Sequence, residues 1–435
     1  MWKSKIFRAS VLLAFFTIVG KLLGLWRDRI LAGQFGASVD LDVYYAAFRI
    51  PDLIFNLFIL GATSSAIVPI FIEYYHKERP LAWQVAGNFL NVMSAGVVLV
   101  SVVAMIFAEP IARLIGPGFE PESTKLLAGL IRIMLISSMI FAVSTILGSI
   151  LHALQRFVAY SLAPVFYNLG IIAGAVYLAP RLGIFGVAWG VVIGAALHLL
   201  VQLPVAWRAG FRFSRAFDIS DGAFRRMLGL MIPRTLALGS YNVGITIVSA
   251  IASLMSAGSL TILNLATNLS YVPVSVIGIS LATAIFPQLS SDATNRDLGE
   301  FRRKLNHALW GTLLLTGVTA VLMFAFRHLI VDIIFKVGAF READRILTAY
   351  VVGIFMFSVI AQSLMHIITR AYYSFQNTKT PFMVALLSII LNVWLSYLLG
   401  LQMDLGVKGI AIATVIAHNL NFILLWIIFR VKYRL

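Results

Sequence analysis

Long uninterrupted apolar runs constrain this chain more than any other feature of its sequence. About twelve stretches have the roughly 20 hydrophobic residues that an α-helix needs to cross a bilayer. A backbone in lipid must satisfy its own hydrogen bonds, so such runs fold as helices. We therefore predict an all-α polytopic membrane protein with about 12 transmembrane helices, at approximately 8–31, 42–73, 84–108, 126–151, 158–179, 184–207, 227–254, 260–287, 306–330, 346–373, 382–402 and 407–430.

The basic residues mark the orientation of these spans. The net charge is +16, yet only 12% of the 435 residues are charged, and most of the charges fall in short loops between apolar runs. This placement is typical of topology signals and argues against nucleic-acid binding. With the N-terminus inside, the inner segments hold 20 Lys and Arg residues and the outer loops hold 8. The positive-inside rule thus predicts that both termini are cytoplasmic, with the first run kept as a helix.

Short sequence matches indicate that the two halves of the chain repeat. AIVP at 66–69 returns as AIFP at 284–287, and GIFGVA at 183–188 returns as GVKGIA at 406–411. Six spans per half give a parallel repeat, and transporters built this way hold substrate between the halves. We predict an N-terminal six-helix lobe at 1–207, a basic cytoplasmic linker at 208–226 that serves as a hinge, and a C-terminal six-helix lobe at 227–435.

Charged side chains inside the first two spans are the candidate functional residues. On a helix with 100° per residue, Lys21, Arg27 and Asp28 share a face, whereas Arg29 points to the far side as an interfacial anchor. In span two the spacing 3, 4, 3, 4 predicts one polar stripe, formed by Asp42, Tyr45, Arg49, Asp52 and Asn56.

Two interpretations of these polar faces stay open. Charges at membrane depth cost at least a few kcal/mol each and usually face protein or water. The groups can pair with one another and join helices, or they can line a water-filled cavity that receives an anion. In the second case the acids orient the cations or carry protons. The substrate-binding candidates are Lys21, Arg27, Arg49, Asp28, Asp42, Asp52 and Asn56.

The sequence carries no motif of an enzyme. It has no G-x-x-x-x-G-K-[ST] loop, no G-x-G-x-x-G and no H-E-x-x-H, and it has no cysteine. We therefore expect no catalytic residues, no cofactor, no metal site and no ATP hydrolysis. An ion gradient or the membrane potential is the expected driving force.

Residues 27–71, RDRILAGQFGASVDLDVYYAAFRIPDLIFNLFILGATSSAIVPIF, resemble the MurJ (MviN) family of lipid II flippases. This family belongs to the multidrug/oligosaccharidyl-lipid/polysaccharide exporter superfamily. The similarity continues through APVFYNLGIIAGA, GIFGVAWG, RAYYSFQNTKTP and GVKGIAIAT, and it covers essentially the whole chain. The family motif appears here as Arg27-Asp28 after Lys21, Phe35-Gly36, Asp42 before Tyr44-Tyr45, Arg49 before Pro51, Gly61-Ala62-Thr63-Ser64 and Val68-Pro69.

The resemblance implies two lobes around a central cavity whose basic residues contact a lipid-linked diphosphate. That role falls to Lys21, Arg27 and Arg49, with Asp28 and Asp42 as partner acids. The implied substrate is lipid II, the polyprenyl-diphosphate-linked glycopeptide used in peptidoglycan and cell-wall synthesis. It would move from the cytoplasmic to the outer leaflet of the bacterial inner (plasma) membrane by alternating access, among membrane lipids and with a possible coupling cation or proton.

The chain departs from the family pattern at several positions. Phe55 or Asn56 stands where the family has an arginine, and Asn268 and Tyr271 replace an Arg and a Glu before a proline. Val248 occupies the place of an acid that serves a cation site in some members, and twelve spans are predicted against fourteen in the family. Three alternatives stay open: a flippase for another polyprenyl-linked glycan, a cation-coupled multidrug exporter of the same superfamily, and a non-transporting scaffold of cell-wall assembly.

Overall fold

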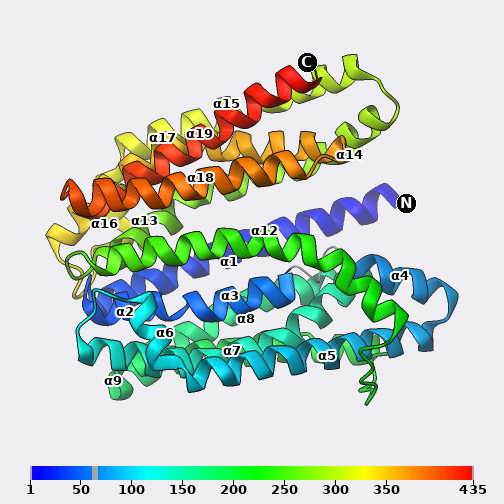
Figure 1. Cartoon of the computed structure of the whole chain (residues 1–435), viewed down its shortest axis with the longest axis horizontal. Helices are drawn as coiled ribbons and strands as arrows, with labels where there is room; N and C mark the ends of the chain where they lie inside the picture. The colour runs from blue at the N-terminus through cyan, green and yellow to red at the C-terminus, as the bar shows by residue number, and fades with distance from the viewer. Residues whose placement is uncertain (1, 61–66, 434–435) are drawn as a thin grey trace. The chain divides into compact units, whose positions relative to one another are not determined.

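The computed structural model describes residues 2–60 and 67–433, and all regular structure in these ranges is helical (Figure 1). The chain forms two compact units. The N-unit consists of Met1–Leu31 and Val43–Thr246, and the C-unit consists of Ala32–Asp42 and Ile247–Leu435. Because a short piece near the N-terminus belongs to the C-unit, the two units are not simply consecutive in sequence. The all-helical fold predicted from the apolar runs is confirmed.

The N-unit is built around α7, a long helix that packs against α3, α5 and α10. Figure 1 shows α5 and α7 running side by side. Helices α1, α2 and α12 begin or end in this unit and continue into the other. The elements are α1 (Trp2–Phe35), α2 (Val39–Ala47), α3 (Arg49–Phe55), the π-helical segment η1 (Asn56–Leu60), α4 (Val68–Lys77), α5 (Arg79–Ile106), α6 (Ala108–Ile115), α7 (Pro121–Ala153), α8 (Phe157–Ala173), η3 (Gly174–Leu178), α9 (Ala179–Leu182), α10 (Ile184–Leu200), α11 (Leu203–Arg208) and α12 (Gly222–Ser253).

In the C-unit, α17 takes the central place that α7 has in the N-unit. It packs against α13, α14, α15 and α19, and α18 covers α19. An aromatic cluster that includes Phe301, Tyr372 and Phe429 joins α15, α17 and α19 near the C-terminus. The elements are α13 (Ser259–Pro273), η4 (Val274–Ile279), α14 (Ser280–Thr294), α15 (Leu298–Ala325), α16 (Arg327–Phe335), α17 (Glu342–Ser374), α18 (Lys379–Tyr397), η5 (Leu398–Gln402) and α19 (Gly406–Tyr433).

Nine helices among the described residues are long and apolar enough to cross a membrane. Nine of the predicted runs coincide with these helices, which begin with α5 and end with α19. The other three runs coincide with α1, with the interrupted segment from α2 to α4, and with α12, whose apolar part is Leu238–Ser253. The structure therefore confirms a multi-pass membrane protein, whereas it does not confirm the count of twelve.

The backbone confirms the internal repeat that the sequence matches predict. The π-helical segments η1 and η4 occupy equivalent places in the two halves, and so do η3 and η5. Gln155 and Gln376 both adopt a left-handed conformation, with φ of 59° and 56°, at the end of α7 and of α17. Each helix closes with the same hydrogen bond across six residues, at Arg156 N to Leu151 O and at Asn377 N to Tyr372 O. Such matched irregularities indicate two copies of one architecture.

The units have other bounds than the lobes predicted at 1–207 and 227–435. The N-unit continues through the loop and through most of α12, to Thr246. Hydrogen bonds explain this extension, because Thr235 donates to the carbonyl of Leu57 at 3.0 Å and Arg226 pairs with Glu73 at 2.8 Å. Residues 208–226, predicted as a basic linker or hinge, lie within the N-unit.

Close glycine contacts hold α8, which carries two residues of the candidate site. A Cβ placed on Gly170 would lie 2.3 Å from the backbone of Gly194, and one on Gly194 would lie 2.5 Å from the carbonyl oxygen of Tyr167. Only glycine allows helices to approach this closely, and small residues are typical of helix interfaces in membranes. The contact fixes the position of Tyr167 and Asn168 in the N-unit.

Candidate substrate-binding site

Arg27 lies at the centre of a polar cluster inside the N-unit. Its Nε and Nη2 donate to the same oxygen of Asp28, at 3.0 and 2.8 Å. Its Nη1 donates to Oδ1 of Asn168 on α8, at 3.2 Å. The Asn168 amide is itself fixed, because its Nδ2 donates to the carbonyl of Pro164 at 3.0 Å. Two neighbours thus hold the guanidinium in one orientation.

The Arg27–Asp28 pair is largely withdrawn from the surface of the N-unit. The side chain of Asp28 is 2% exposed and that of Arg27 is 20% exposed. A guanidinium has five N–H groups, and contacts with Asp28 and Asn168 use three of them among the described residues. Arg27 can therefore hold its structural partners and still donate to an anion.

A second basic group, Arg49 on α3, belongs to the same region of the N-unit. Asp52, one turn further along α3, interacts with Arg49 electrostatically, and so does Tyr241 on α12. Tyr167 on α8 lies within electrostatic range of both Arg27 and Asp52. Arg27 and Arg49 thus have neighbours in common, and their joint role in one site stays a prediction.

Asn56 and Lys21 occupy the two margins of this cluster. Asn56 is the first residue of η1, where its Nδ2 donates to the carbonyl of Asp52 at 2.7 Å and to Oδ1 of Asn242 at 3.2 Å. Asn56 therefore connects α3 with α12. Lys21 is exposed on α1 and lies within electrostatic range of Arg27. Six of the seven predicted site residues belong to the N-unit.

Asp42 is the exception, and its predicted place in the polar stripe is wrong. Its carboxylate is buried in the C-unit, where it accepts hydrogen bonds from the backbone of Gly258 and Thr261 and from the Thr261 hydroxyl. The stripe was predicted with a bend at Pro51, and the structure has an interruption there, because α2 ends at Ala47 and α3 begins at Arg49. Pro51 explains the break, because a proline ring clashes with the carbonyl four residues earlier, here that of Ala47.

Sequence reasoning missed three polar residues of the cluster. They are Tyr167, Asn168 and Asn242, which are far from the first two spans in the sequence. A single sequence does not show which distant residues are in contact. The signal available for Asn168 was a polar residue within the apolar run APVFYNLGIIAGA. Thr63 and Ser64, which belong to the family motif, lie outside the described residues.

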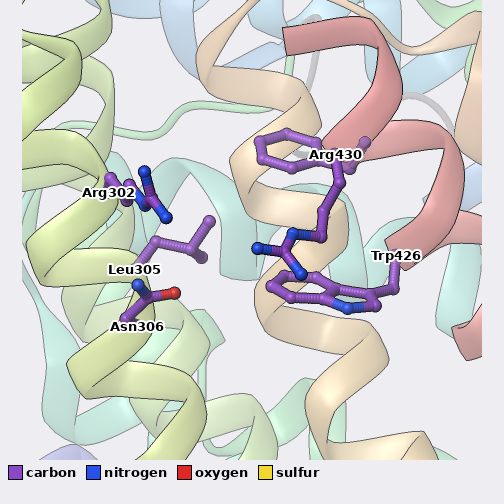
Figure 2. Close-up of a pocket in the computed structure, with 6 residues that line it drawn as sticks. Arg302, Leu305, Asn306, Trp426 and Arg430 are labelled. Atoms are coloured by element: carbon purple, nitrogen blue, oxygen red, sulfur yellow. The ribbon is translucent and has the colours of Figure 1, made fainter. Parts of the chain in front are cut away.

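The C-unit contains two pockets that hold none of the predicted site residues. Figure 2 shows the smaller one, where Arg302 and Asn306 of α15 face Arg430, which lies over the ring of Trp426 on α19. Its volume of about 20 Å³ is that of one or two water molecules. The larger pocket, of about 540 Å³, lies between α14 and α15 and includes Gln288 and His307.

A helical membrane protein with a repeated architecture and a preorganised arginine in one half belongs to the class of multi-pass transporters. The sequence profile of the family described as "Lipid II flippase MurJ" matches residues 31–435. The chain therefore belongs to the MurJ family, and the resemblance seen in the sequence is confirmed.

Similar proteins agree with this assignment. "Lipid II flippase MurJ" of Burkholderia cenocepacia is 28% identical, over 92% of this chain and 81% of the relative. "Probable lipid II flippase MurJ" of Thermotoga maritima is 29% identical, over 94% and 82%. The solved structure "Lipid II flippase MurJ, inward closed conformation" has a TM-score of 0.82 at 25% identity, with 97% of this chain and 87% of that chain covered.

A multidrug exporter shares the fold alone. An inward-facing multidrug resistance MATE family transporter of the MOP superfamily has a TM-score of 0.81, over 95% of this chain and 94% of that chain. Its sequence is only 13% identical. The two proteins therefore share an architecture, whereas the family of this chain is shown by the match of residues 31–435.

Proposed function

We propose that this protein is a lipid II flippase of the bacterial inner membrane that moves the peptidoglycan precursor from the cytoplasmic to the outer leaflet. The match of residues 31–435 to the MurJ family carries this proposal. The polar cluster of the N-unit supports it, because a diphosphate is an anion that needs fixed cationic partners. The inner position of both termini rests on the loop charges.

Arg27, Arg49 and Lys21 bind the diphosphate of the substrate. Three cations against the carboxylates of Asp28 and Asp52 leave the cluster with one net positive charge. Hydrogen bonds between Arg and phosphate oxygens are charge-assisted and can be bidentate. Asp28 and Asn168 hold the Arg27 guanidinium in place before the substrate arrives, so little side-chain entropy is lost when it binds.

Translocation proceeds by alternating access of the substrate headgroup while the polyprenyl tail stays in lipid. The protein acts as a transporter and not as a catalyst, and its sequence carries no nucleotide-binding motif through which ATP would supply the energy. Asp52 is our candidate for the acid that binds a coupling proton or cation, because Asp28 and Asp42 are engaged in strong contacts. A drug exporter is not favoured, since it would not need fixed phosphate-binding arginines.

Complementation of a flippase-depleted bacterium tests the proposal. Expression of this chain should restore growth and cell shape, and lipid II should become accessible at the outer leaflet. Arg27→Ala, produced at equal membrane abundance, is the matched negative control. Full membrane abundance without any lipid II translocation would contradict the proposal. If this chain transported another polyprenyl-linked glycan instead, it would be a flippase for that glycan, which is one of the alternatives left open by the sequence.

A further inference from the structure

The loop between α11 and α12 forms a fixed strap along α5 of the N-unit. The amide of Asn88 forms two hydrogen bonds with the backbone of Asp218, at 2.9 and 2.7 Å. The amide of Asn91 donates to the carbonyls of Ser214 and Ala216, at 2.7 and 2.8 Å. We call residues 211–219 the strap. It has no helical structure of its own, so side chains of α5 replace the backbone partners that a helix would supply.

Packing between strap and helix is close as well. A Cβ on Gly87 would lie 2.9 Å from the Cβ of Ser214, so only glycine lets the strap approach here. At one end of the strap, the ring of Phe211 packs edge-on against Trp83 at 5.8 Å. The orientation of the outward side chains is thus determined by the fold.

The outward face of the strap is both apolar and basic. Phe213 is 73% exposed, Phe217 56% and Ile219 58%. Two exposed arginines accompany them, Arg212 just before Phe213 and Arg215 between Phe213 and Phe217. Aromatic and aliphatic side chains held in water by a rigid backbone are unfavourable. A rigid face of this composition therefore indicates a contact with something apolar and anionic.

The position of the strap along α5 places it at a membrane boundary. With 28 residues, α5 is about 42 Å long, which exceeds the hydrocarbon core of about 30 Å. If its exposed end at Ile106 lies at one boundary, Asn88 lies about 27 Å away along the helix axis. Asn88 and the strap bound to it then reach the opposite boundary, where headgroups begin.

We propose that the strap is an interfacial membrane anchor, in which Phe213 and Phe217 insert at the boundary of headgroups and acyl chains while Arg212 and Arg215 bind phosphates of anionic lipids. Residues 208–219 contain three arginines, Arg208, Arg212 and Arg215, against one carboxylate, that of Asp218. An anionic leaflet attracts such segments, and interfacial elements combine apolar and basic side chains in this way.

The anchor has a structural consequence for the start of α12. Asp221, two residues after the strap, accepts a hydrogen bond at 2.9 Å from the backbone of Phe224 in the first turn of that helix. A strap held in the interface thus fixes the depth at which α12 begins. This role concerns the position of the N-unit in the leaflet, and it is independent of the substrate.

The experiment uses the natural absence of cysteine from the chain. Single cysteines replace Phe213 or Phe217 in the full chain, and Asn295→Cys in an exposed polar loop is the control. Each protein is labelled with an environment-sensitive fluorophore and reconstituted into phosphatidylcholine vesicles with or without phosphatidylglycerol. Quenching by a lipid nitroxide near the headgroup is compared with quenching by aqueous iodide.

We expect labels at positions 213 and 217 to be quenched by the lipid nitroxide and protected from iodide, and the label at 295 to show the reverse. Phosphatidylglycerol should increase lipid quenching at 213, and the pair Arg212→Gln and Arg215→Gln should remove this increase. Iodide quenching at 213 and 217 equal to that at 295 would overturn the inference. Protection from both quenchers would also overturn it, because a protein partner would then cover the strap.

Discussion

Asp42 and Thr261 are joined by two hydrogen bonds of 2.6 Å, from the backbone N–H and from the hydroxyl of Thr261 to the same carboxylate oxygen. The other oxygen accepts from the backbone N–H of Gly258 at 2.7 Å. These donors belong to Gly258, the N-cap residue of α13, and to Thr261 in its first turn, where backbone N–H groups lack intrahelical partners and the helix dipole favours negative charge. Asp42 therefore caps a helix from a distant part of the sequence.

Neutralising this cap should destabilise the C-unit. Asp42→Asn keeps one acceptor oxygen but brings an NH₂ group toward the N–H donors, and it removes the charge. Buried hydrogen bonds to charged groups contribute about 1.5–3 kcal/mol each, so we expect a loss of a few kcal/mol. Thermal unfolding in detergent measures this loss. Asp40→Asn, exposed and two residues away, is the matched control, and equal effects of both substitutions would show that the cap is not important for stability.

Hydrophobic length and helical periodicity predict most of the fold and the neighbourhood of Arg27 and Asp28, because both depend on residues close in sequence. The spacing within 42–56 could not place Asp42, because its carboxylate accepts hydrogen bonds from Gly258 and Thr261 in a distant part of the chain. The contact from Arg27 to Asn168 joins residues 141 positions apart. Periodicity within one helix contains no information on such a contact.

Arg27 and Arg29 should differ sharply in their effect on transport. Arg27→Ala removes a charge-assisted contact of about 1.5–3 kcal/mol with the diphosphate, so lipid II translocation should fall by roughly ten- to a hundredfold. Arg29→Ala, predicted to remove only an interfacial anchor, should leave activity within a few-fold. Arg27→Lys keeps the positive charge but lacks the planar guanidinium that can donate two parallel hydrogen bonds, so its transport rate should be intermediate.

All three variants must be compared at equal membrane abundance, because Arg27→Ala also leaves the buried Asp28 without its closest cation. Translocation of lipid II in depleted cells is the measurement. If Arg29→Ala abolished transport while Arg27→Ala did not, the substrate would lie on the opposite face of α1.

Asn168 should act on transport through Arg27. Its carbonyl oxygen orients the guanidinium, and Asn168→Leu removes this one acceptor while keeping a side chain of similar size. A neutral partner of this kind contributes about 0.5–1.5 kcal/mol, so translocation should fall by about two- to tenfold. In the Arg27→Lys background the same substitution should have little further effect on transport, because the guanidinium that Asn168 orients is no longer present. Additive losses in the double variant would show that Asn168 acts independently.

Substitution of Asp52 should affect the ion coupling of transport, whereas substitution of Asp28 should affect the stability of the N-unit. Asp52→Asn should change how transport depends on the ion gradients or on the membrane potential, if Asp52 carries the coupling charge. Asp28→Asn should instead lower the stability of the N-unit, because Arg27 then loses its charged partner. Translocation is measured in proteoliposomes with imposed gradients, and unfolding is measured in parallel. An Asp52→Asn protein with unchanged activity and ion dependence would place coupling elsewhere.

The hydrogen bonds of Asn88 should decide whether the strap stays closed. Asn88→Leu removes both bonds to the backbone of Asp218 and leaves two polar backbone groups without their buried partner. Hydrogen bonds contribute about 0.5–1.5 kcal/mol each to stability, and a loss of about 1.4 kcal/mol raises the open population of the strap tenfold. When opening is fast, cleavage by a protease follows the open population. Trypsin should therefore cut after Arg212 and Arg215 about ten times faster in Asn88→Leu than in the wild type.

Gln84→Leu, an exposed substitution on the same helix, should leave cleavage unchanged. Equal cleavage in the wild type and in Asn88→Leu would show that the strap is held by other contacts.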